Sequence, residues 1–257
     1  MSSNLLVVEN LTVTAAGKNV VNAASLEIPF LSVTALVGGS GSGKTTTGLA
    51  ILRLLPLGLA VRDGRILFAG KDVLNLTAEQ MRLLRGKEIG MVFQEPLYAF
   101  NPVFSIGEQI DEVLRVHTSL NRHQRHARIL ELLDLVGLPD PQRTAGNYPH
   151  QLSGGMRQRA MIAQAIAAGP KLIIADEPTS NLDVTLQARI MELFRKLKDE
   201  LQLSILLITH DLGMVAHVAD RVAVMTEGMI VEQGMTKDVL RGPQHPYTRT
   251  LMETIEV

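Results

Sequence analysis

The chain contains no cysteine among its 257 residues. Its own side chains therefore cannot form disulfide bonds, thiolate metal sites or iron–sulfur clusters, and this composition fits a reducing compartment. Neither sign of charge is in excess, because 25 Lys and Arg residues stand against 26 Asp and Glu residues, a formal net charge of −1. This balance provides no global basic field for nucleic acid, so we expect no nucleic-acid partner.

Long apolar runs are also missing. The most leucine-rich stretch, residues 48–61, is interrupted by Arg53, Pro56 and Gly58, whereas a membrane-spanning helix needs about 18 or more apolar residues in succession. Residues 1–4 lack the basic flank and apolar core of a secretion signal. We expect a soluble, cytosolic protein that meets a membrane only through a partner. A hydrophobic content of 46% allows a substantial core.

One octet predicts a nucleotide site. Residues 38–45 read Gly-Gly-Ser-Gly-Ser-Gly-Lys-Thr and fit the phosphate-binding pattern G-x-x-x-x-G-K-[ST]. They lie between an apolar, β-branched run at 33–37, typical of a buried strand, and a predicted helix at 45–55. A flexible Gly/Ser linker is the alternative interpretation, but linkers do not normally separate a buried strand from a helix. We therefore predict that the chain binds a nucleoside triphosphate.

The chemistry of this loop follows from its residue types. The glycines let successive backbone N–H groups point at phosphate oxygens, and the helix N-terminus adds a partial positive charge. Lys44 would reach the β and γ phosphates, and the Thr45 hydroxyl would bind Mg²⁺. The residues predicted to bind nucleotide here are Gly38, Gly39, Ser40, Gly41, Ser42, Gly43, Lys44, Thr45 and Thr46.

The order of the other predicted elements indicates an α/β fold. Short strands are expected at 5–8 and 11–14, around a turn at Glu9 and Asn10, and again at 24–28 and 64–70. Short apolar runs typical of a parallel sheet follow at 172–175, 205–209 and 222–225, with 229–232 pairing back on the last of them. Between these two groups, helical spacing of apolar residues predicts a mostly helical insert with helices at 106–116, 121–136 and 156–168.

Two adjacent carboxylates end the predicted strand at 172–175. Asp176 is placed to hold Mg²⁺, usually through water, and Glu177 to polarise the water that attacks the γ-phosphate. Two acids after a strand also suit the N-terminus of a helix, and that alternative loses weight only because a phosphate loop precedes them.

A second anion site is predicted at Leu-Ser-Gly-Gly-Met-Arg-Gln-Arg, residues 152–159. Ser153 is a good helix N-cap, and the following glycines keep the backbone accessible. By itself this stretch could equally be an ordinary helix cap after a loop.

Taken in order, these motifs resemble those of ABC transporter ATPases. The set comprises the phosphate loop, Gln94, Leu-Ser-Gly-Gly-x-x-Gln-Arg, Asp176-Glu177, Asn181-Leu-Asp183 and His210. The likeness spans most of the chain and implies a P-loop ATPase with a parallel sheet, an N-terminal antiparallel β part and a helical insert. It implies one domain over residues 1–257, with a RecA-like core at 1–95 and 165–240, a helical subdomain at 96–164 and a short tail at 241–257.

The resemblance also implies a head-to-tail dimer that encloses ATP and Mg²⁺. The Lys44 loop of one subunit would hold ATP, and the facing subunit would cover its γ-phosphate with Ser153, Gly154, Gly155 and Gln158. Asp183 would communicate across the dimer.

The roles implied around the γ-phosphate are catalytic and metal-binding. Gln94 would sense Mg²⁺ and the attacking water, and His210 would contact the γ-phosphate and position Glu177. The implied catalytic residues are Glu177, His210 and Lys44, and the implied magnesium residues are Thr45, Gln94 and, through water, Asp176.

Within the superfamily the chain resembles importer ATPases for dipeptides, oligopeptides and nickel. Residues 93–102, 148–159 and 245–249 carry this likeness. It implies a subunit at the cytoplasmic face of the cell membrane, bound to two permease subunits that an extracytoplasmic binding protein supplies. A second ATPase, related or identical, completes the implied complex, whose cargo is a peptide, nickel or a metal chelate.

Two of the chain's departures from the family pattern lie in segments expected near the nucleotide. Residues 11–21 contain no aromatic side chain to stack on adenine, and Ala15, Ala16 and Val20 stand there instead. Asn181 occupies a position where a small apolar residue is usual. Two other function classes stay open at this point: an ABC ATPase acting on DNA or ribosomes, and a regulatory subunit that binds ATP without hydrolysing it.

Overall fold

The computed structural model describes residues 4–180 and 182–253 and divides into two compact units. Unit 1 contains the described residues up to Met81 and from Arg195 onward, and unit 2 contains Arg82–Phe194. Each unit combines strands and helices, so the predicted α/β class is confirmed. Asn181 lies outside the described residues.

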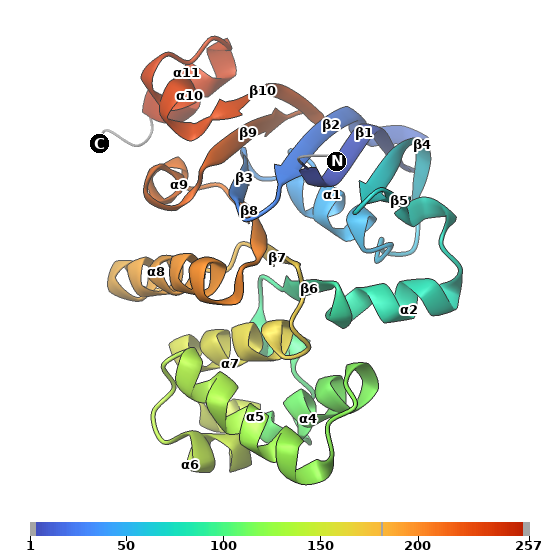
Figure 1. Ribbon diagram of the computed structural model, residues 1–257. Helices are drawn as coiled ribbons and strands as arrows, with labels where there is room; N and C mark the ends of the chain where they lie inside the picture. The colour runs from blue at the N-terminus through green and yellow to red at the C-terminus, as the bar shows by residue number, and fades with distance from the viewer. Residues whose placement is uncertain (1–3, 181, 254–257) are drawn as a thin grey trace. The chain divides into compact units, whose positions relative to one another are not determined.

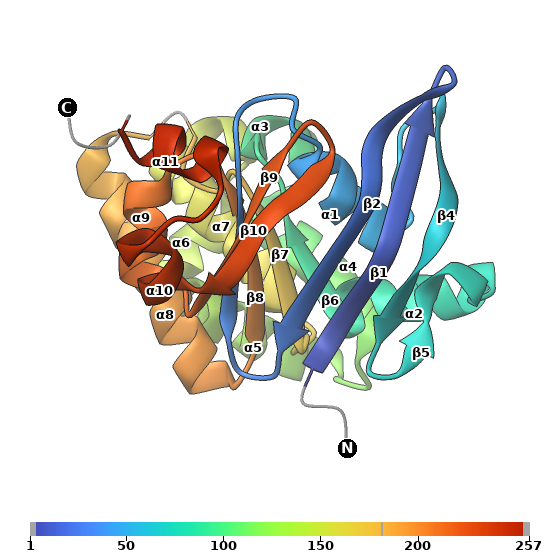
Figure 2. The same ribbon diagram turned by 90° about the horizontal axis from the view of Figure 1, so that it is seen from above.

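An antiparallel sheet forms the first part of unit 1, with strand order β2-β1-β4-β5 (Figure 2). Its strands are β1 Asn4–Ala15, β2 Lys18–Pro29, β4 Leu59–Phe68 and β5 Lys71–Asp72. The predicted turn at Glu9 and Asn10 is wrong, because β1 runs through both residues. Asn10 adopts a left-handed φ of 49°, and the pairing with β2 shifts register between Val8 and Leu11. A β-bulge thus absorbs the turn-forming residue without ending the strand.

The second part of unit 1 is built around β3, Val33–Val37, all of whose residues are buried. This strand pairs in parallel with both β8, Ser204–Thr209, and β9, Arg221–Thr226, and β10, Met229–Met235, returns antiparallel to β9. The predicted buried strand and the predicted hairpin are both confirmed. A continuous apolar run suits such a strand because both faces of the sheet are covered.

Three helices from the last part of the chain pack against this sheet. They are α9 Leu212–Val218, α10 Thr236–Arg241 and α11 Pro246–Glu253 (Figure 1). Their apolar side chains join a core cluster that contains Val37, Val215 and Val224, and Tyr247 and Leu251 pack against it. The described part of the chain after residue 240 is therefore folded onto the sheet.

Unit 2 joins a short parallel pair of strands to a group of helices. The strands are β6 Ile89–Val92 and β7 Leu172–Asp176. The predicted insert contains α4 Ile106–His117, α5 Arg122–Leu135, α6 Pro141–Gly146 and α7 Gly154–Ile166. Complete capping boxes start α4 at Ser105 and α5 at Asn121, which explains why these two helix starts could be read from sequence.

The remaining helical elements are short or were not predicted. They are α1 Lys44–Ile51, α2 Ala78–Lys87, α3 Pro96–Ala99, α8 Val184–Leu201 and the 3-10 turns Val73–Asn75 and Pro149–Gln151. Helix α1 ends earlier than the expected residue 55, because Arg53 takes a left-handed φ of 51° and Pro56 follows. Over the part of the chain that the structure describes, no helix has the length and apolar character needed to cross a bilayer.

Candidate nucleotide site

The phosphate loop connects β3 to α1 in a conformation that requires glycine. Gly41 and Gly43 have φ values of 76° and 103°. A Cβ atom at Gly43 would lie 2.9 Å from the carbonyl oxygen of Val20, and one at Gly38 would overlap the carbonyl oxygen of Met225. The loop therefore packs directly on the backbones of two neighbouring strands, where no side chain fits.

Backbone hydrogen bonds fasten the loop to the turn between β9 and β10. The N–H of Gly228 donates to the carbonyl oxygen of Ser42 at 3.0 Å, and the N–H of Asn22 donates to the carbonyl oxygen of Gly228 at 2.8 Å. One turn residue thus links the loop to β2. The loop keeps a fixed shape because its neighbours hold it, although its own sequence is rich in glycine.

Lys44 lies against the inside of this loop. Its side chain is buried, and the Nζ atom donates to the carbonyl oxygens of Gly38 and Gly39, both at 2.8 Å, with the Ser42 Oγ atom at 3.4 Å. Gly43 is the N-cap of α1, so no capping side chain covers the start of this helix. A fixed ammonium group beside an open helix N-terminus is suited to binding phosphate oxygens.

Unit 1 also brings His210 to the edge where the loop begins. β3 and β8 run parallel with Val37 opposite Thr209, so Gly38 and His210 follow paired positions at the same ends of adjacent strands. Directly after His210, the Asp211 carboxylate accepts the N–H of Met214 at 3.0 Å and starts α9. The carboxyl ends of parallel strands are the usual place for ligand sites in α/β proteins.

Unit 2 groups Gln94, Asp176 and Glu177 in the same way. Val92 of β6 pairs with Ala175 of β7, so the segments that follow both strands leave the sheet at one edge. Asp176 is buried, Glu177 is half-buried and Gln94 is exposed. Glu177 has a left-handed φ of 47°, a strained conformation for a residue other than glycine and one that occurs often at functional sites.

Ser180 is a residue of this group that the sequence analysis missed. Its Oγ atom lies 2.9 Å from the carbonyl oxygen of Glu177 and 3.2 Å from that of Gln94, so it can donate to either. The N–H of Ser180 also donates to the Glu177 carbonyl oxygen, at 3.1 Å. The only available signal was a serine three residues after the second acid, which resembles any turn.

The Leu-Ser-Gly-Gly motif forms the start of α7. Ser153 is the N-cap, with its Oγ atom accepting the N–H of Met156 at 3.3 Å. Ser153 and Gly154 are exposed, whereas Gly155 and Gln158 are buried. A Cβ atom at Gly155 would lie 3.2 Å from the Leu186 side chain of α8, so a larger residue here would crowd the packing of the two helices.

Asp183 is also at a helix start. Its carboxylate accepts the N–H of Leu186 at 3.0 Å and thereby begins α8. Each unit therefore presents its own part of the predicted set: the loop, Lys44, Thr45 and His210 in unit 1, and Gln94, Ser153, Asp176, Glu177 and Asp183 in unit 2.

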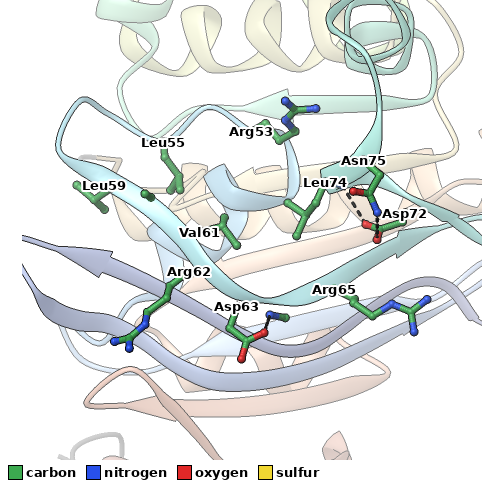
Figure 3. A pocket seen from close by; sticks show the side chains of 12 residues that line it. Arg53, Leu55, Leu59, Val61, Arg62, Asp63, Arg65, Asp72, Leu74 and Asn75 are labelled. Carbon is green, nitrogen blue, oxygen red and sulfur yellow. Dashed lines mark hydrogen bonds between the residues drawn. The ribbon is translucent and has the colours of Figure 1, made fainter.

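A cavity of about 730 Å³ in unit 1 lies elsewhere (Figure 3). Apolar side chains such as Leu59, Val61 and Leu74 line it together with Arg53 and Asp72. Its twelve lining residues include none of the predicted nucleotide-binding residues. The site is thus indicated by loop geometry and strand register.

Comparison with known proteins identifies the family and the relatives that this chain resembles. A family model described as ABC transporter matches residues 21–180. The oligopeptide transport ATP-binding protein OppD of Bacillus subtilis (strain 168) is 50% identical over 222 residues, which cover 86% of this chain and 62% of that protein. The dipeptide transport ATP-binding protein DppD of the same strain is 49% identical over 222 residues, 86% of this chain and 66% of that protein. The chain spans less than two thirds of the length of these two relatives.

Solved structures agree with the sequence relatives. A dimeric ATP-binding cassette in a post-hydrolysis state, bound to ADP and Pi, has a TM-score of 0.80 and 27% identity, covering 90% of this chain and 98% of that chain. The structure of cbiO1 from Clostridium perfringens has a TM-score of 0.81 and 28% identity and covers both chains completely. The phosphate loop lies inside the matched range and has the geometry described above, and the chain belongs to the ABC transporter family.

Proposed function

We propose that this chain is the ATP-binding and ATP-hydrolysing subunit of an importer for peptides. The observation that carries the proposal is the rigid phosphate loop, with Lys44 held against its inner face by the Gly38 and Gly39 carbonyl oxygens. The peptide cargo is supported by the relatives, whose names state oligopeptide and dipeptide transport.

The chemistry assigned to the chain is attack of water on the γ-phosphorus of ATP. Glu177 accepts the proton of that water as the new P–O bond forms and the bond to the bridging oxygen of ADP breaks. Lys44 and the N–H groups of the loop other than that of Gly39, which donates to Tyr247, bind the phosphate oxygens, and His210 contacts the γ-phosphate and positions Glu177.

Magnesium fits the donor set. Thr45, Gln94 and Asp176 offer hydroxyl, amide and carboxylate oxygens, the hard ligands that Mg²⁺ prefers. When bound, the ion neutralises charge on the β and γ phosphates.

A second copy, or a related ATPase, completes the site in this proposal. Ser153 and Gly154 are exposed at the N-terminus of α7 and cover the γ-phosphate held by the facing subunit, with Gly155 and Gln158 supporting them from beneath. Asp183, at the start of α8, transmits the state of one site to the other. The dimeric cassette among the solved structures supports such an arrangement.

Permease subunits are the proposed membrane partners, supplied by an extracytoplasmic binding protein. An exposed apolar patch around α3 in unit 2 supports this: Leu97 is 49% exposed, Tyr98 83% and Val103 70%. Exposed apolar residues gathered in one segment are typical of a surface that binds another protein. The chain is thereby proposed to lie at the cytoplasmic face of the cell membrane, attached through these subunits.

Substitution Glu177→Gln tests the catalytic assignment. The variant keeps the shape of the side chain and loses the proton acceptor, so we expect hydrolysis to fall by about 100-fold or more while ATP still binds. Light scattering after gel filtration should show ATP-dependent dimers that persist in the variant. Glu192→Gln, an exposed site on α8, is the matched control and should behave as the wild type.

The result that overturns the assignment is steady-state hydrolysis by Glu177→Gln at a near wild-type rate. Co-purification with nucleic acid in place of permease subunits would instead overturn the importer proposal. A wild-type chain that binds ATP but does not hydrolyse it, even with its partners, would point to the regulatory class.

A further inference from the structure

The helix at the C-terminal end of the described chain touches the phosphate loop through a tyrosine hydroxyl. The N–H of Gly39 donates to the Oη atom of Tyr247 at 2.8 Å, across 208 positions of sequence. A Cβ atom built on Gly39 would lie 3.1 Å from the same oxygen, so the loop backbone approaches the hydroxyl closely. Both residues belong to unit 1.

Polar contacts hold the segment that carries Tyr247 in place. The Glu232 carboxylate, on β10, accepts the N–H groups of Gln244 at 2.8 Å and of His245 at 3.0 Å. His245 Nδ1 in turn accepts the N–H of Tyr247 at 3.2 Å, and the Arg249 guanidinium donates to the carbonyl oxygen of Pro243 at 3.0 Å. Side chains thus hold the backbone of the turn before α11 through the N–H groups of Gln244, His245 and Tyr247 and the carbonyl oxygen of Pro243.

Apolar packing fixes the same helix from below. The rings and chains of Tyr247, Leu251 and Met252 pack against the core cluster that includes Val37, the residue immediately before the loop. Tyr247 therefore packs against the core, half-buried, and presents its hydroxyl to the loop.

The contact acts on the peptide group that faces Lys44. The N–H of Gly39 and the carbonyl group of Gly38 belong to one planar peptide unit, so fixing the N–H direction also fixes the carbonyl direction. That carbonyl oxygen accepts a hydrogen bond from Lys44 Nζ at 2.8 Å. A rotation of this peptide unit would move the oxygen that positions the ammonium group.

We propose that Tyr247 is a positioning residue of the nucleotide site, which orients the Gly38–Gly39 peptide and, through it, Lys44. The C-terminal segment thereby becomes part of the ATP site through the backbone of the loop. The inference rests on the proposed function, since ATP is taken as the ligand of the loop.

The test is Tyr247→Phe, which keeps the ring in the core and removes the hydroxyl. A neutral hydrogen bond contributes about 0.5–1.5 kcal/mol, so the dissociation constant for ATP should rise about 2- to 13-fold. Titration with a fluorescent ATP analogue measures it, and a urea unfolding curve of the same variant reports stability. Tyr148→Phe, in unit 2, is the matched loss of a hydroxyl and should leave the dissociation constant unchanged.

A double-mutant cycle separates positioning from general packing. Gly39→Ala places a methyl group against the Oη atom of Tyr247. Tyr247→Phe removes that oxygen and so relieves the crowding. We expect the combined variant to lose less affinity than the product of the two single fold-changes.

The possible outcomes separate the positioning role from the proposed function. Wild-type affinity in Tyr247→Phe, or strictly multiplicative effects in the cycle, overturns the positioning role. A lower unfolding midpoint with unchanged ATP affinity assigns Tyr247 to the core alone and also overturns it. Undiminished ATP binding by Lys44→Ala contradicts the proposed function itself, whatever Tyr247→Phe shows.

Discussion

At the scale of single residues, backbone strain and the proposed chemistry coincide at Glu177. A left-handed conformation costs a residue other than glycine about 1–3 kcal/mol, and it persists only where the surroundings impose it. Here the N–H of Ser180 donates to the Glu177 carbonyl oxygen, with the Ser180 hydroxyl also within reach. These contacts fix the backbone from which the proposed base projects, and with it the direction of the Glu177 Cα–Cβ bond.

The phosphate loop allows a sharp comparison between two glycines. Gly43→Ala places a Cβ atom 2.9 Å from the Val20 carbonyl oxygen at a φ of 103°, whereas Gly41→Ala, at a φ of 76°, meets no atom within 4 Å. We expect the first substitution to cost about 2–4 kcal/mol of unfolding free energy and the second about 1 kcal/mol. Urea unfolding of both variants measures the difference. Equal losses would show that the backbone angle alone, and not the packing on β2, requires glycine.

At the scale of elements, β1 shows how local signals mislead. Glu9 and Asn10 are turn-forming residues. The parts of β1 before and after them nevertheless pair with β2 on one side and with β4 on the other. Gly64 on β4 accommodates the bulge, because a Cβ atom there would lie 2.6 Å from the Cα atom of Leu11. Pairing with a strand on each side outweighs the local preference for a turn. The residues of β1 do not reveal this, because both partner strands lie elsewhere in the sequence.

The link between β10 and α11 should depend on pH. Burial acts to raise the pKa of Glu232, but hydrogen bonding from Gln244, Thr248 and His245, together with the charge of His245, outweighs it and leaves the pKa below its ordinary value. A lowered carboxylate pKa means that its stabilisation is complete above about pH 4.5 and is lost as the pH falls through the folded-state pKa. Because Glu232 is only partly shielded from solvent, we expect Glu232→Gln to cost about 1 kcal/mol at pH 7.

Unfolding curves at pH 7 and near pH 3 check this. The difference in unfolding free energy between wild type and Glu232→Gln should shrink at the lower pH. Glu200→Gln, exposed on α8, serves as the control and should show a smaller difference at pH 7. A penalty for Glu232→Gln that does not change with pH would contradict the role assigned to the carboxylate charge.

At the scale of the whole molecule, the proposed site needs two subunits. Ser153 and Gly154 are exposed at the start of α7, and the room around Gly154, whose nearest neighbour to an added Cβ atom is Leu182 at 3.9 Å, allows a side chain. Gly154→Asp should therefore fold and bind ATP, but its carboxylate should repel the γ-phosphate held by the facing subunit.

Mixing two inactive variants tests this arrangement. Lys44→Ala disables the phosphate loop. Gly154→Asp disables the lid, which is the start of α7 at Ser153 and Gly154 that is proposed to cover the γ-phosphate of the facing subunit. Each variant alone should therefore not hydrolyse ATP. In a mixed dimer, one site combines the intact loop with the intact lid, and an equal mixture should recover about a quarter of the wild-type activity. Phosphate release measures the recovery, in the presence of the membrane partners if the isolated chain is inactive. No recovery in a mixture that forms mixed dimers would contradict the shared site.

Features that depend only on neighbouring residues along the chain could be predicted from the sequence alone. The order of glycines before Lys44 sets a phosphate-binding turn, the apolar runs at β3, β7 and β8 set buried strands, and Ser105 and Asn121 set helix starts, because each depends on neighbours along the chain. The tertiary structure decided the bulge in β1, the Ser180 contact with Glu177 and the Tyr247 contact with Gly39. The bulge and the Tyr247 contact join segments far apart in sequence, and the Ser180 contact depends on the backbone conformation of Glu177. Only the folded backbone brings these groups to hydrogen-bonding distance, and residue type alone does not specify that approach.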